Sequence, residues 1–136
     1  MIELVEDRLD IDTYLELRQS VQFRELTRDQ AKKGLSNSLY TLVAFKDGKA
    51  VGMGRIVGDG AIICYVQDLI IRPEVQGEGI GGLILETLKK FVIQEGYEGT
   101  TMMFDLMCAK HGFIARPTKD LGPGMIQFIQ IGSDEQ

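Results

Sequence analysis

The sequence predicts a mixed α/β (α+β) fold in which helices flank a mostly antiparallel central sheet. Two Asp-Gly pairs, at 47–48 and 59–60, divide residues 39–71 into three strand-like segments, and such pairs are typical of hairpin turns. A glycine-rich loop, a helix-like segment at 79–94 and another strand-like segment at 100–104 follow. A strand, a helix and a strand in this order favour parallel pairing, so we expect both strand directions in one sheet.

The chain before these strands predicts one strand and two short helices. Residues 2–6 alternate between apolar and polar side chains, as a half-buried strand does. Asp10 or Asp12 is well placed to cap a first helix. Thr27, followed three positions later by Gln30, resembles a capping box, in which each side chain binds the other residue's backbone amide. We therefore expect a second short helix to begin there.

The long helix predicted at 79–94 has one apolar face, and Gly96 marks its end. The face consists of Ile80, Leu83, Ile84, Leu88, Phe91 and Val92. After the strand at 100–104, the pattern predicts a short helix at 105–110 and a final strand at 125–131.

Composition predicts a single domain over residues 1–136 in the cytoplasm. Apolar residues make up 44% of the chain and charged residues 26%, which suits a globule with one core. The net charge is −5 and the basic residues cluster only in pairs, so we expect no nucleic-acid partner. No apolar run approaches the ~20 residues that span a bilayer, and the acidic N-terminus does not resemble a signal peptide. The sequence leaves open whether the protein forms a homodimer.

The cysteine and histidine content predicts no metal site. Cys64 and Cys108 are far apart in sequence, and His111 is the only histidine. These residues cannot supply the four Cys or His ligands of an ordinary zinc site.

Residues 76–82, Gln-Gly-Glu-Gly-Ile-Gly-Gly, are the most informative segment. They lie between the longest predicted strand and the longest predicted helix. Glycines allow a ligand to approach the backbone closely, and the start of a helix offers free N–H groups and a partial positive charge. The segment therefore predicts an anion site of the kind that binds phosphates.

Two familiar phosphate motifs fit this loop poorly. A P-loop needs Lys-Ser or Lys-Thr after its glycines, and neither is present. The dinucleotide pattern GxGxxG matches Gly77, Gly79 and Gly82. In a Rossmann unit, however, the strand runs directly into the first glycine, whereas residues 72–76 intervene here. A small dinucleotide-binding protein stays as a weaker alternative.

A third pattern matches better. Gln76-x-x-Gly79-x-Gly81 resembles the pyrophosphate-binding motif Q/R-x-x-G-x-G/A of the GNAT superfamily of N-acetyltransferases. Lys110, Gly112 and Phe113 agree with a later family pattern, F-Y-x-K-x-G-F. The resemblance covers about residues 38–131 and is most specific from Val66 to Leu85.

The resemblance implies acetyl-CoA as co-substrate, held where two parallel strands of the sheet splay apart. The backbone of Leu69, Ile70 and Ile71 would pair with the pantetheine arm like an added strand. Backbone amides would wrap the pyrophosphate, and these belong to Gln76, Gly77, Glu78, Gly79, Ile80, Gly81 and Gly82.

The implied chemistry is direct attack of a neutral primary amine of a small molecule on the thioester. A backbone N–H near Leu69 would stabilise the oxyanion. Asp68 or Gln67, polar residues in an apolar strand, would line the acceptor cleft, or one of them would face solvent. Asp68 is the candidate base. Cys108 stands where the family often has a Tyr that protonates the leaving thiolate, and its thiol is a candidate donor.

An acidic chain with Asp68 near the cleft favours a cationic acceptor, such as a polyamine or an amino sugar. The departure at Cys108 also leaves open a module that binds CoA without catalysing transfer.

Overall fold

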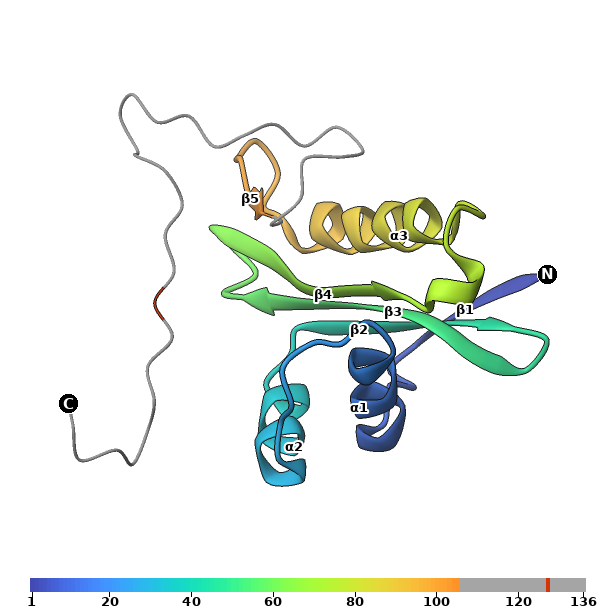
Figure 1. Ribbon diagram of the computed structural model, residues 1–136. Coiled ribbons are helices and arrows are strands. Elements are labelled where there is room, and N and C mark those ends of the chain that lie inside the picture. Colours follow the sequence, from blue (N-terminus) through green and yellow to red (C-terminus); the bar gives the residue numbers. More distant parts are fainter. Residues whose placement is uncertain (106–126, 128–136) are drawn as a thin grey trace, which may run out of the picture.

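The computed structural model describes residues 1–105 and residue 127. Within this part, a strand and two helices come first, then three strands, a long helix and a last strand, as drawn in Figure 1. The strands are β1 (Ile2–Glu6), β2 (Tyr40–Lys46), β3 (Lys49–Gly58), β4 (Ile63–Ile71) and β5 (Met103–Asp105). The helices are α1 (Ile11–Ser20), α2 (Arg28–Ser36) and α3 (Ile80–Glu95), with a 3₁₀ turn, η1 (Pro73–Val75), before α3.

The described strands form one mixed sheet in the order β1-β2-β3-β4-β5. Each neighbouring pair from β1 to β4 is antiparallel, and β5 lies parallel to β4. This confirms the predicted fold class, including the antiparallel meander and the parallel pairing across the long helix.

The predicted helix starts are confirmed by their caps. Asp10 caps α1, because its carboxylate accepts a hydrogen bond of 2.7 Å from the amide of Thr13. Thr27 and Gln30 form the predicted capping box at the start of α2. Gly96 ends α3, as expected.

The two predicted turns differ from each other. Asp47 and Gly48 both have left-handed backbone angles (φ 52° and 80°), which is the geometry of a tight hairpin turn. The second turn is wider than predicted, since β4 begins only at Ile63. Asp59 organises it by accepting hydrogen bonds from the amides of residues 61–63 at 2.8, 2.7 and 3.1 Å. These bonds lower the pKa of the Asp59 carboxyl.

The strand predicted after the long helix is also shifted. It was expected at 100–104, and β5 occupies Met103–Asp105, because the chain first makes a turn in which the Thr100 amide donates to the Tyr97 carbonyl. Asp105 is the last residue of this strand. The elements predicted after it lie outside the described residues.

Helices cover both faces of the sheet. In Figure 1, α3 lies on one face, and α1 and α2 lie on the other. The α3 face is closely packed, because a Cβ built on Gly54 of β3 would lie 2.7 Å from the Ile84 side chain of α3. The other face packs Tyr14 and Leu17 of α1 against the sheet.

A register shift in β4 decides which of its side chains meet which helices. Arg55 of β3 pairs with Asp68, but the next residue, Ile56, pairs with Val66, so Gln67 is an extra residue in β4. Such a bulge interrupts the alternation of side chains. Consequently Val66 packs in the core cluster under α3, whereas the even-numbered positions after the bulge face α1.

Candidate functional site

The glycine loop bends at two left-handed residues. Gly77 and Gly79 both have φ of +86°, a conformation that favours glycine, and a Cβ at either position would meet nothing within 4 Å. Gly79 is the N-cap of α3 and gives it no side-chain cap. The loop is therefore shaped by glycine conformations and not by packing, and its surface side is open.

The amides of this loop remain available to a ligand. Among the described residues, no backbone amide from Gly77 to Gly82 donates to a backbone carbonyl outside a regular element, and the first amide to do so is that of Leu83, which donates to Gly79. The first amides of a helix have no partner within the helix either. Only the Gln76 amide is engaged, since it donates to the Pro73 carbonyl at 3.3 Å. The loop can thus hold an anion with successive N–H groups and the positive end of α3.

One edge of β4 leads to this loop. The Arg72 amide donates to the Val51 carbonyl at 2.8 Å, so it points toward β3. By the alternation of an antiparallel pair, the main-chain groups of Ile71 and Leu69 point to the opposite edge, and those of Ile70 point to β3. The Gln76 side-chain amide donates to the Ile71 carbonyl at 3.0 Å, as that orientation requires.

This edge has no partner strand near the loop in the described part of the chain. β5 pairs only with residues 63–65 of β4. Leu69 therefore offers an outward N–H and C=O to an extended ligand, and Ile71 an outward N–H, while Ile70 contributes a buried side chain on the α1 face. Ile80, at the start of α3, is also buried and offers the loop only its amide.

An ion pair places a positive charge beside the loop. Lys46, at the end of β2, lies 2.8 Å from the Glu78 carboxylate. The hydrogen bond to Glu78 and its negative charge raise the pKa of Lys46. Lys46 thereby offsets the one carboxylate that lies within a loop otherwise suited to anions.

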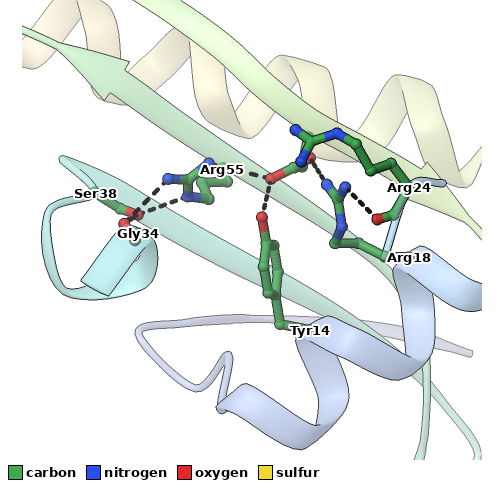
Figure 2. Close-up of polar contacts among 7 residues, drawn as sticks. Tyr14, Arg18, Arg24, Gly34, Ser38 and Arg55 are labelled. Atoms are coloured by element: carbon green, nitrogen blue, oxygen red, sulfur yellow. Dashed lines mark hydrogen bonds and ion pairs between the residues drawn. The ribbon is translucent and has the colours of Figure 1, made fainter. Parts of the chain in front are cut away.

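Asp68 is enclosed by three donors from two elements. Its side chain is 1% exposed. Its Oδ2 accepts hydrogen bonds from the Tyr14 hydroxyl at 2.7 Å and Arg55 Nη1 at 3.2 Å, and its Oδ1 accepts one from Arg18 Nη1 at 3.0 Å. Figure 2 shows Tyr14, Arg18 and Arg55 converging from α1 and β3. We call these four residues the Asp68 cluster.

The charges of the Asp68 cluster do not cancel. Two guanidinium groups face one carboxylate, which leaves a net charge of +1. Burial, followed by the charge of Asp68, raises the pKa of Tyr14 to about 12, so this phenol is neutral at ordinary pH. The carboxylate that suggested a cationic acceptor is thus already matched by two arginines.

The two arginines differ in how fully they are bonded. Arg55 also donates to the Ser38 hydroxyl at 2.8 Å and the Gly34 carbonyl at 3.0 Å, which ties β3 to α2 (Figure 2). Arg18 donates to Asp68 and to the Arg24 carbonyl at 3.0 Å, and its buried Nε has no hydrogen-bond partner among the described residues. Arg18 therefore keeps donor capacity.

A pocket of about 320 Å³ lies against Arg18, between α1 and the segment that follows it. Its lining consists of Leu15, Arg18, Gln19, Phe23, Arg24, Glu25 and Leu26. We call it the Arg18 pocket. One of its lining residues, Arg18, also contacts Asp68 and so connects the pocket to β4 on the α1 side of the sheet.

Sequence reasoning found Asp68 but missed its three partners. Arg55 is a charged residue within an otherwise apolar strand, which is a signal that could have found it, whereas Arg18 lies among other polar residues of its helix and carries no such signal. Of the alternatives considered for the strand, Gln67 is the solvent-exposed residue and Asp68 the buried one. Cys108 and His111 lie outside the described residues, so the suggested thiol donor stays a prediction.

No group of three or more metal-binding side chains occurs among residues 1–105. Likewise, the helices of that range are too short or too polar to cross a membrane.

The open strand edge and the unengaged loop amides of this mixed sheet are suited to an extended, anionic ligand. The family model described as the Acetyltransferase (GNAT) family matches residues 4–112. The chain belongs to the GNAT acetyltransferase family.

Two solved structures share the fold over nearly the whole chain, and a third shares it over a smaller part. A protein from meticillin-resistant Staphylococcus aureus, described as a probable acetyltransferase, is 28% identical with a TM-score of 0.81, covering 95% of this chain and 100% of that one. A GNAT family acetyltransferase from Streptococcus pneumoniae is 28% identical with a TM-score of 0.74, covering 96% and 99%. An aminoglycoside 6′-N-acetyltransferase complexed with coenzyme A shares the fold at 15% identity and a TM-score of 0.58, covering 71% and 57%.

Among curated proteins, a ycf52-like N-acetyltransferase from Prochlorococcus marinus, described as uncharacterized, is 26% identical over 126 residues, or 90% of this chain. The chain spans 61% of that relative's length. It spans 23% of a chloroplastic GCN5-related N-acetyltransferase from Arabidopsis thaliana, which is 28% identical over 60 residues.

Proposed function

We propose that this acetyltransferase moves an acetyl group from acetyl-CoA to a primary amine of a small molecule, by direct attack in a ternary complex. The observation that carries the proposal is the row of unengaged amides from Gly77 to Gly82, next to the outward main-chain groups of Leu69 and Ile71. The amides suit the diphosphate of acetyl-CoA, and the strand edge suits its amide-bearing pantetheine arm.

The strand edge also suits the reaction itself. The amine lone pair forms a C–N bond with the thioester carbon, and the carbonyl electrons move onto oxygen. An outward N–H at Leu69 is the proposed donor to that oxyanion, an effect worth about 3–4 kcal/mol where such a donor has been removed. The C–S bond then breaks, and CoA thiolate leaves with the bonding electrons.

The attacking nitrogen must also lose a proton. Asp68 was the candidate base, but it is 1% exposed and both of its oxygens already accept hydrogen bonds. We therefore assign Asp68 a positioning role, in which it fixes Arg18 and Arg55, and we propose that water carries the proton away. Cys108 remains a candidate donor to the thiolate.

A matched pair of glycine substitutions tests the cofactor site. Gly79→Val should weaken acetyl-CoA binding at least tenfold, because the side chain would stand where the diphosphate approaches the amides. Gly99→Val is the control, since Gly99 (φ +80°) also has nothing within 4 Å of its Cβ, and lies beyond the other end of α3. Both variants carry similar backbone strain, so titration calorimetry separates site loss from strain. Equal affinity in the two variants would remove the loop from the site.

A module that binds CoA without turnover is the remaining alternative, and the departure at Cys108 favours it. Release of free CoA thiol across a panel of amines separates the two functions. Binding without any turnover would support the module. The dinucleotide alternative loses its structural basis, since strands β1 to β4 are antiparallel and a Rossmann sheet is parallel.

A further inference from the structure

We infer that the acceptor is a small amine that also bears a carboxylate, such as an amino acid, and that Arg18 recognises this carboxylate from the Arg18 pocket. This inference rests on the proposed function and adds the class of acceptor. It is carried by the donors left on Arg18, by the charge of its surroundings and by the position of the pocket.

Arg18 has donors to spare. A guanidinium offers five N–H donors in a planar fork that matches a carboxylate. Two hydrogen bonds are made by Arg18, to Asp68 and to the Arg24 carbonyl, and its Nε has none among the described residues. Its side chain is 10% exposed, so it is desolvated, and a desolvated charge binds an opposite charge more strongly than a surface charge does.

The surroundings favour an anion. Within the described part of the chain, Arg18 and Arg24 line the pocket with a single acidic residue, Glu25. The carboxylate behind Arg18, that of Asp68, is shared with Arg55, so these three residues retain a net charge of +1. A bound carboxylate would bring that charge to zero. An acceptor with a second ammonium group would instead increase the unbalanced positive charge.

The position of the pocket fits the reaction. Arg18 links the pocket to Asp68, and the next residue of β4 carries the outward N–H proposed to bind the oxyanion. The aliphatic part of the lining, Leu15 and Leu26, and the ring of Phe23 can accept an apolar side chain. An amino acid whose carboxylate meets Arg18 would therefore bind on the α1 side of β4, where Asp68 precedes Leu69.

The test compares amino acids with their own carboxamides, which differ only in the charge to be recognised. Acetyl transfer is measured as release of CoA thiol for a panel of such pairs. We expect kcat/KM to be about 10- to 100-fold higher for the preferred amino acid than for its carboxamide, as for a charge-assisted hydrogen bond. The amine of a carboxamide loses its proton more readily, so intrinsic reactivity works against this preference.

Variants then assign the preference to the pocket. Arg18→Lys keeps the charge but loses the planar fork. It should reduce the ratio of kcat/KM for the amino acid to kcat/KM for its carboxamide at least fivefold. Arg24→Gln, which leaves the Asp68 cluster intact, should reduce it by a smaller factor. Arg28→Gln is the control, because Arg28 is exposed and pairs with Asp12 on the surface, so the ratio should not change.

The outcomes separate the two proposals. Turnover at equal rates on acids and amides, or a preference for diamines, would overturn this inference and leave the acetyltransferase proposal standing. A preference for acids that survives in both Arg18→Lys and Arg24→Gln would also overturn it. Binding of acetyl-CoA without turnover on any amine would overturn the proposed function, and this inference with it.

Discussion

Removing the charge of Asp68 should destabilise the fold far more than removing the charge of a surface aspartate. Asp68→Asn keeps the shape of the side chain but leaves Arg18 and Arg55 without a counter-charge in a buried site. Breaking a buried ion pair by removing one partner costs about 3–5 kcal/mol. A domain of this size is stable by only about 5–15 kcal/mol, so the expected fall in melting temperature is roughly 10–20 °C.

The matched control is Asp12→Asn. Asp12 also pairs with an arginine, Arg28, at 2.5 Å, but its side chain is 82% exposed. An exposed pair of this kind contributes about 0–1 kcal/mol. Urea and thermal unfolding at pH 7 measure both variants. If Asp68→Asn unfolds no more easily than Asp12→Asn, the arginines have another source of compensation and the assigned positioning role is wrong.

Three further substitutions test other parts of the structure. Tyr14→Phe should reduce the loss of folding stability between pH 10 and 12. The folded state holds the phenol proton up to a pKa of about 12, above the usual value for tyrosine. The stability that this raised pKa contributes is therefore complete below pH 10 and disappears as the pH rises through 12. Gly54→Ala should lower the free energy of unfolding by about 1–3 kcal/mol in urea, since its Cβ would meet α3 at 2.7 Å. Glu78→Gln should tighten acetyl-CoA binding several-fold by calorimetry, because Lys46 is then free to face the diphosphate.

Each of these has a control and a contrary outcome. Tyr40→Phe should also reduce the loss of stability at high pH, because burial and the Glu6 carboxylate raise the pKa of Tyr40. An unchanged loss of stability at high pH in both tyrosine variants would contradict the titration argument. Full stability of the Gly54 variant would mean that α3 can move outward at little cost. Glu74→Gln removes a carboxylate outside the loop, 3.7 Å from Lys49, and an equal gain in affinity there would reduce the Glu78 effect to general charge.

The parts of the fold that the sequence predicts well are those governed by local contacts. The capping box at Thr27, the Asp47-Gly48 turn and the apolar face of α3 each depend on residues a few positions apart. The second turn was predicted as tight because Asp59-Gly60 resembles the first, but the Asp59 carboxylate reaches forward to the amides of residues 61–63 and widens it. Local composition does not distinguish these two uses of Asp-Gly.

The Asp68 cluster could not be predicted, because its members are distant in sequence. Tyr14 and Arg18 lie 54 and 50 positions before Asp68, and they meet it only because α1 packs across the sheet. Each residue has an ordinary local reason to be in its own element. The loop amides, in contrast, could be predicted, because a glycine-rich helix start offers N–H groups whatever the remaining fold is.

The bulge at Gln67 shows how one extra residue in a strand decides which residues distant in sequence can meet. Regular alternation would place Asp68 on the same face as Cys64 and Val66, in the apolar core under α3, where a carboxylate has no partner. The extra residue turns Asp68 to the other face, where Arg18 and Arg55 meet it, and leaves the exposed Gln67 in between. β4 has an apolar sequence interrupted by polar residues, and it consists of two short segments whose even-numbered side chains face opposite sides of the sheet. The change of phase lies just before Leu69, so the α1 side of the sheet becomes polar at the point where the β4 edge is open.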